Sequence, residues 1–388
     1  MQRRTFVTAG VLASAAGCLR LQDNNGDEDQ TGGTENDDTD GPELSDGETD
    51  DSEEEAARLY AFDESGQAEW THDTLPNGQE TRIDYVVTDD DVVAYATVDS
   101  GGGSEQDPVV RGLDTATGDL LWEFPFERGF YSGLAIYGDT LYIGRLGELV
   151  LLELQSGTEL DRYDYSIGFN GLVAGPSTLY ITADTAVAFD PSTNSERWRG
   201  ELERQPESRP VLADGRLYYG TESGYVVAID ADSGERIWET RVEESVRYRT
   251  VVTDEFVLVI DEADSVYAID RSAGEIVYRH DAEIDGYQLA TVGNRVYIPE
   301  AETPTVYEVS GSGSGIALTE LWESPVRGIS VFSREEEFVV ARRAIHRLDP
   351  DGTIVWQAEM DDGYSVSVAG AGEAVAADNG RWFVGASE

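Results

Sequence analysis

The residue type with the most specific chemistry in this chain is cysteine, which occurs once, as Cys18. It follows Ala15, Ala16 and Gly17 at the end of a short apolar run over residues 6–16. Small residues directly before a cysteine resemble a lipobox, in which the thiol is acylated and the cysteine becomes the new N-terminus. Ala15 replaces the leucine that is usual at its position. The pattern predicts a lipid on Cys18.

Two adjacent arginines, Arg3 and Arg4, precede the same apolar run and resemble a twin-arginine export signal. The run is too short for an ordinary transmembrane helix. We therefore predict a twin-arginine and lipoprotein signal over residues 1–18, and a protein anchored by lipid to the outer face of the cell membrane. The alternative is a cytoplasmic chain with an accidental arginine pair and a chance cysteine.

The next segment, residues 19–57, is predicted to be a disordered acidic tether. Residues 23–55 contain 16 Asp or Glu, and Leu44 is their only large apolar side chain. Such a stretch cannot bury enough apolar surface to offset the loss of chain entropy, and its like charges repel one another. Its expected role is to hold the folded part away from the membrane.

Other residue types capable of chemistry do not form a recognisable site. The three histidines, His72, His280 and His346, are scattered, whereas a zinc site normally draws on clustered ligands. The segment from Asp230 to Gly234 resembles a calcium loop but lacks the downstream ligands at the required spacing. We predict no catalytic, metal-binding or cofactor-binding residues, and ordinary structural roles for these side chains.

One phrase recurs from Leu59 onward: an apolar strand, an Asp, a short turn with Gly, and an aromatic residue, usually Trp. The Asp-equivalent positions are 63, 114, 153, 190, 230, 270, 310 and 349, a spacing near 40 residues after a longer first gap. Six of the seven Trp fall at the aromatic position, and Trp382 is the exception. The predicted structural motif residues are Asp63, Trp70, Asp114, Gly118, Trp122, Asp190, Trp198, Asp230, Gly234, Trp238, Asp270, Gly274, Tyr278, Trp322, Asp349 and Trp356.

Short alternating runs separated by Asp-Gly and Ser-Gly turns predict about four strands per repeat, which is one propeller blade. The fold class is therefore all-β, and we predict an eight-bladed β-propeller of four-stranded antiparallel blades over residues 58–388. N-terminal strands Leu59–Phe62 and Gln67–Thr71 should pair with C-terminal strands to close the ring. The C-terminal candidates are Tyr364–Ala369, Glu373–Ala377 and Arg381–Gly385, so one strand is surplus to a four-stranded blade.

The phrase resembles the tryptophan-docking motif of the pyrroloquinoline quinone (PQQ) repeat propellers, and Ala228, Asp230, Gly234 and Trp238 match it fully. That family includes quinoprotein alcohol dehydrogenases and non-enzymatic members, among them the lipoprotein of the bacterial outer-membrane barrel-assembly machinery. Resemblance to the dehydrogenases would imply an adjacent cysteine pair over the quinone, which a chain with only Cys18 lacks.

Two functions follow from this resemblance. The first is a non-enzymatic cell-surface binding or scaffold propeller that acts as a monomer on an unknown protein or surface ligand. The alternative is a PQQ-dependent quinoprotein dehydrogenase or another extracytoplasmic enzyme. The missing cysteine pair and the short repeat insertions favour the first, with no cofactor.

The composition restricts the partners. The formal net charge is −51, with 78 Asp and Glu, and all 27 basic residues are Arg. Such a field repels phosphate backbones and anionic lipid surfaces, so we exclude nucleic acid and allow membrane contact only through the lipid. Molar salt would screen the self-repulsion, which favours a halophilic, haloarchaeal-type protein over a very acidic mesophilic one.

Overall fold

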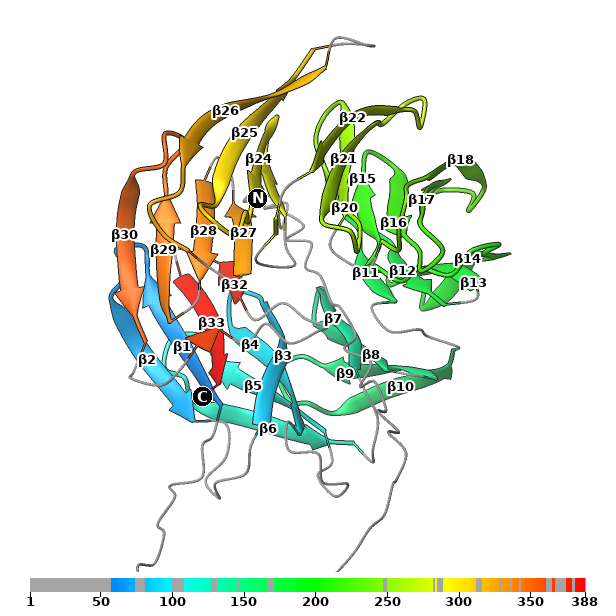
Figure 1. Ribbon diagram of the computed structural model, residues 1–388. Helices are drawn as coiled ribbons and strands as arrows, with labels where there is room; N and C mark the ends of the chain where they lie inside the picture. The colour runs from blue at the N-terminus through cyan, green and yellow to red at the C-terminus, as the bar shows by residue number, and fades with distance from the viewer. Residues whose placement is uncertain are drawn as a thin grey trace, which may run out of the picture.

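The computed structural model describes residues 57–73, 81–99, 108–126, 131–145, 147–165, 171–183, 185–246, 250–281, 283–284, 289–311, 316–327, 330–334, 337–341, 343–360, 365–366, 375–378 and 381–387. The regular elements in this part of the chain are all β-strands, and they form antiparallel sheets arranged in a ring (Figure 1). Among the described residues there is no helix of the length and apolarity needed to cross a bilayer.

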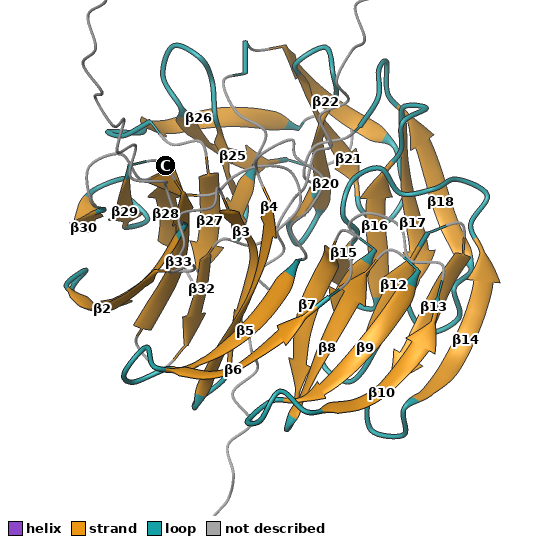
Figure 2. Cartoon of the chain, turned by 90° about the horizontal axis from the view of Figure 1, so that it is seen from below, coloured by secondary structure: helices purple, strands orange, loops and turns teal. Residues whose placement is uncertain are grey.

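Seven sheets are four-stranded blades whose strands follow chain order from the centre of the ring to its rim (Figures 1 and 2). The first four blades comprise β3 (Thr81–Thr88), β4 (Val92–Asp99), β5 (Val109–Asp114) and β6 (Leu120–Pro125); β7 (Tyr131–Tyr137), β8 (Thr140–Arg145), β9 (Glu148–Glu153) and β10 (Glu159–Asp164); β11 (Leu172–Ala174), β12 (Leu179–Thr182), β13 (Thr185–Asp190) and β14 (Ser195–Glu201); and β15 (Val211–Ala213), β16 (Arg216–Gly220), β17 (Tyr225–Asp230) and β18 (Arg236–Arg241).

The remaining three blades comprise β19 (Val251–Val252), β20 (Phe256–Ile260), β21 (Ser265–Asp270) and β22 (Ile276–Asp281); β23 (Ala290–Val292), β24 (Arg295–Ile298), β25 (Thr305–Ser310) and β26 (Ala317–Glu323); and β27 (Ser330–Arg334), β28 (Glu337–Ala341), β29 (Ala344–Leu348) and β30 (Ile354–Glu359). The third strand of a blade is typically buried along its length, as in β17, because neighbouring blades cover both of its faces.

Both ends of the chain contribute to one further sheet, which we call the terminal sheet. It contains β1 (Arg58–Asp63), β2 (Ala68–Asp73), β31 (Ser365–Val366), β32 (Val375–Asp378) and β33 (Arg381–Ser387). β33 pairs with β1 along its full length, and β31 and β32 share its other edge. The innermost position is thus divided between two short strands, which makes this a five-stranded sheet.

The prediction of eight four-stranded blades is therefore wrong, because the structure has seven. The prediction fails at the C-terminal segment. With β1 and β2 already in the terminal sheet, a four-stranded blade needs two more strands, but this segment supplies three. β1 and β33 both bind in the middle of the terminal sheet, so neither is displaced, and the surplus strand extends the sheet to five. The described parts of the segment that begins at Tyr364 are β31, β32 and β33.

A β-bulge recurs between the third and fourth strands. The register shifts between Ala228 and Ile229 opposite β18, and equivalent shifts occur in the pairs β1–β2, β5–β6, β13–β14 and β21–β22. A bulge twists a strand and changes where its side chains point. Here it lies immediately before the aromatic residue of the repeat, so that residue is directed at the next blade.

Candidate functional site

Where a repeat has the motif Asp, that side chain is bonded to its own turn. Asp230 Oδ1 accepts the backbone N–H groups of Asp232 (3.1 Å) and Ser233 (2.8 Å) and the Ser233 hydroxyl (2.8 Å). These bonds, led by the Ser233 hydroxyl, hold the pKa of Asp230 below its usual value. Asp63, Asp114, Asp190, Asp270 and Asp349 accept equivalent bonds. In the described part of the chain no group of three or more His, Cys, Asp or Glu is placed to hold a metal.

Where a repeat has the motif Trp, that residue docks on the following sheet. The Nε1–H group of Trp238 donates to the carbonyl of Arg271 at 3.1 Å, and its ring lies against Gly274. Four further indoles, those of Trp70, Trp122, Trp198 and Trp322, donate to the residue after the next acidic motif position, at 2.7 to 3.1 Å. Trp356 lies against Gly66, so its ring meets the turn glycine of the terminal sheet as the other rings meet theirs.

The glycine of each motif turn is needed for this contact. At Gly274 the φ angle is 73°, and a Cβ would come within 2.7 Å of the Trp238 ring. The equivalent distances at Gly66, Gly118, Gly157, Gly234 and Gly352 are 2.5 to 2.7 Å. We call each contact between consecutive sheets a seam and name it by its docking residue. The predicted motif residues thus meet pairwise across seams, and they do not converge on one site.

Two seams have no motif Trp. At the first, Asp161 stands at the Trp position of β10, and Tyr163 packs edge-on against Phe189 with 5.5 Å between ring centroids. The Tyr142 hydroxyl donates to Asn194 Oδ1 at 3.0 Å and to the Pro191 carbonyl at 3.2 Å. A cluster of aromatic side chains therefore fills the Tyr163 seam.

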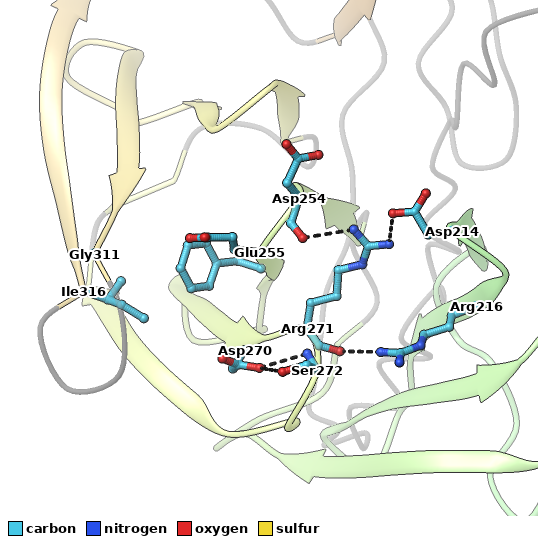
Figure 3. A pocket seen from close by; sticks show the side chains of 10 residues that line it. Asp214, Arg216, Asp254, Glu255, Asp270, Arg271, Ser272, Gly311 and Ile316 are labelled. Atoms are coloured by element: carbon cyan, nitrogen blue, oxygen red, sulfur yellow. Dashed lines mark hydrogen bonds and ion pairs between the residues drawn. The ribbon is translucent and has the colours of Figure 1, made fainter.

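The second seam without Trp, between blades β19–β22 and β23–β26, borders a cavity. Tyr278 stands at the Trp position, and Ser310 replaces the Asp of the turn that would receive it. The cavity has a volume of about 490 Å³ and opens among the turns of three blades (Figure 3). It is lined by Asp214, Arg216, Asp254, Glu255, Phe256, Asp270, Arg271, Ser272, Gly311 and Ile316.

Arg271 forms the best-connected part of the cavity wall. Its Nε–H donates to the Tyr218 hydroxyl at 3.1 Å, and Nη1 donates to the carbonyls of Thr253 and Asp254, each at 3.1 Å. Nη2 is paired with Asp214, and the Arg271 carbonyl accepts a bond from Arg216 at 3.0 Å (Figure 3). The guanidinium groups are thus used to join blades β15–β18 and β19–β22.

The rest of the wall combines carboxylates with two apolar side chains. Asp254 and Glu255 are exposed, whereas Phe256 and Ile316 are buried. The Ser272 hydroxyl donates to Asp270 at 2.7 Å, and this bond lowers the pKa of Asp270. This described lining contains no pairing of a nucleophile with a histidine or lysine base.

The remaining sequence predictions fall elsewhere. Cys18, Arg3 and Arg4 lie outside the described residues. The three histidines lie in three different sheets: His72 on β2, His280 on β22 and His346 on β29. His280 Nε2 lies 2.8 Å from Glu300 Oε1, and burial lowers the pKa of His346. The arginines at the cavity could not be found from one sequence, because Arg271 and Arg216 stand in turns that look like every other turn.

The fold and its docked aromatic residues define a repeat β-propeller in which each sheet is fastened to the next. The chain belongs to the family described as outer membrane protein assembly factor BamB, which it matches over residues 39–168 and 182–328. No curated protein matches it.

Solved structures share the fold at low sequence identity. BamB from Moraxella catarrhalis is 17% identical with a TM-score of 0.50, over 85% of this chain and 90% of that one. The computationally designed Ika8 protein is 16% identical with a TM-score of 0.55, over 79% and 99%. The quinohemoprotein alcohol dehydrogenase of Comamonas testosteroni is 11% identical with a TM-score of 0.50, over 86% and 76%. These likenesses establish the fold and no activity.

Proposed function

We propose that this chain is a non-enzymatic binding or scaffold propeller, and that its partner is another protein. The observation that carries the proposal is the cavity at the Tyr278 seam. Its wall includes Gly311 and Ile316, which flank the turn where the repeat departs from its own pattern. Departures from local rules concentrate at functional positions. Membership in a family described by an assembly factor supports the same role.

The test uses two charge reversals on the same side of the ring. Glu255 is an exposed cavity residue, whereas Asp232 is an exposed carboxylate in the turn of the Trp198 seam. Wild type and both variants would be cross-linked on intact cells in molar KCl and captured. We expect Glu255→Arg to lose a cross-linked protein that wild type and Asp232→Arg retain. Capture of the same protein by all three would exclude this cavity as the binding site.

The alternative is a PQQ-dependent dehydrogenase. Resemblance of this chain to the quinoprotein dehydrogenases would imply an adjacent cysteine pair over the quinone, and the single Cys18 cannot supply one. The residues of this chain therefore do not fit that group. After incubation with PQQ and Ca²⁺ and removal of free quinone, we expect no absorbance from bound quinone. Retention of one quinone per chain would replace the scaffold proposal with the enzymatic one.

The location is proposed from the signal. Cys18 is the residue that a lipid would modify, so Cys18→Ser should release the protein into the medium or leave its signal uncleaved. Fractionation of cells followed by intact mass measurement distinguishes these states. A variant that stays membrane-bound and is processed at the same position would contradict the lipid anchor. Cell-surface labelling of wild type tests which side of the membrane carries the propeller.

A further inference from the structure

The seam between the terminal sheet and blade β3–β6 closes the ring, and two residues of β2 face it. Trp70 lies against Gly118 and donates to the Thr115 carbonyl at 3.1 Å. His72, two residues later on the same face of the strand, is half-buried and bonds to the Gly118 backbone. Its ring meets Tyr95 edge-on, with 6.1 Å between centroids. The histidine is therefore part of the contact that joins the two chain ends to the ring.

A row of three polar side chains on blade β3–β6 lies opposite the histidine. Tyr95, Arg111 and Glu123 are neighbours in register across β4, β5 and β6. Arg111 is only 5% exposed, and its Nε–H donates to Glu123 Oε2 at 2.8 Å. The Glu123 side chain, in contrast, is 46% exposed. The positive charge therefore lies inside the seam, and its carboxylate lies at the rim.

We propose that His72 makes the ring-closing seam acid-sensitive, so that protonation of this side chain loosens the terminal sheet from blade β3–β6. An imidazolium would be held beside the buried Arg111 in a place that water and salt reach poorly. The other charged groups at this position are Asp73, on the same strand and paired with Arg58, and Glu123, paired with Arg111. Both carboxylates are exposed and already bonded to arginine.

The direction of the response follows from the electrostatics. Burial lowers the pKa of His72 most, the charge of Arg111 lowers it further, and the Gly118 backbone and Asp73 oppose these effects in part. Because the folded pKa lies below the unfolded value of about 6.5, the contribution of neutral His72 is complete above that pH and is lost as the pH falls. Each pKa unit between the folded and unfolded states permits up to about a tenfold change in the equilibrium constant for opening of the seam.

The repeat itself supplies the test substitution. Thr240 occupies the same position after Trp238 that His72 occupies after Trp70, and its hydroxyl donates to the Gly274 carbonyl. A threonine can therefore make the equivalent bond without titrating near neutrality. His72→Thr should preserve the seam at pH 7.5 and remove its acid response. His346→Thr is the matched control, because burial also lowers the pKa of His346 but no arginine contributes.

The experiment is hydrogen exchange of the full chain in molar KCl at pH 7.5 and pH 5, corrected for the intrinsic rates. The measured quantity is the exchange of β2 relative to β18, which serves as reference because its seam carries Thr240. In wild type and His346→Thr we expect this ratio to be clearly higher at pH 5 than at pH 7.5. In His72→Thr we expect it to stay constant.

A second variant keeps the proposal testable if threonine at this position prevents folding. Arg111→Gln removes the charge beside His72, so a well-folded variant should lose less protection in acid than wild type does. The proposal would be overturned if the wild-type exchange ratio were the same at pH 5 and pH 7.5. It would also be overturned if His72→Thr responded to acid as strongly as wild type does. An acid response that Arg111→Gln leaves at full size would also count against it.

Discussion

The Trp238 seam and the adjacent Tyr278 seam have the same place in the repeat and are held together differently. At the first, an indole lies on Gly274, and both the indole and Arg216 donate to the carbonyl of Arg271. At the second, Tyr278 stands in place of the indole, and Gly311 and Ile316 of the facing blade line a cavity of about 490 Å³ together with the turns of the two preceding blades. The ring thus accommodates a cavity next to the Trp238 seam, which several hydrogen bonds hold together.

The largest expected effect comes from removing the docked indole. Trp238 is 8% exposed, so Trp238→Ala should lower the free energy of unfolding by about 3–5 kcal/mol. Tyr278→Ala should cost clearly less, because the Tyr278 side chain is only half-buried. Denaturant unfolding of both variants in molar KCl measures the difference. Equal losses would show that the two seams are equivalent in energy.

A smaller effect is expected from adding one methyl group on the receiving side of the seam. Gly274→Ala places a Cβ within 2.7 Å of the Trp238 ring at a φ of 73°, and overpacking together with backbone strain should cost about 2–4 kcal/mol. Gly293 also has a positive φ, 57°, but a Cβ there would meet nothing within 4 Å.

Gly293→Ala is therefore the matched control, with an expected loss of about 1–2 kcal/mol from the backbone alone. Both variants would be unfolded under the same conditions as Trp238→Ala. A loss at Gly274 no larger than that at Gly293 would mean that the indole moves aside, and that the seam is looser than its geometry indicates.

Much of the blade follows from local sequence patterns. The turn from Asp230 to Gly234 fixes its own hydrogen bonds, and the spacing to Trp238 places the ring beyond a bulge. These features depend on residues close in sequence, so one chain suffices to predict them. The number of four-stranded blades does not follow in this way, because β33 could pair with β1 only after the rest of the ring had brought the chain ends together.

The candidate site could not be predicted from the sequence for a related reason. Tyr278 and Ser310 read as weakened copies of the motif, and a weak copy does not show whether its seam is filled or open. At the Tyr163 seam, Tyr142 and Phe189 fill the space, and they come from different blades. At the Tyr278 seam the cavity depends on where Arg271 is held by its partners across the neighbouring seam. Such compensation is visible only after the blades are placed.

The smallest expected effects separate the two seams that lack Trp. Tyr142→Phe removes hydrogen bonds to Asn194 and Pro191, and it should lower the free energy of unfolding by about 1 kcal/mol. Tyr278→Phe should change it by less than about 0.5 kcal/mol, because the hydroxyl of a half-buried side chain can keep water as its partner. Denaturant unfolding of both variants in molar KCl measures the two losses. If Tyr278→Phe were as costly as Tyr142→Phe, the Tyr278 hydroxyl would have to be bonded within the protein. The Tyr278 seam would then be closed by a polar contact of its own, as the Tyr163 seam is.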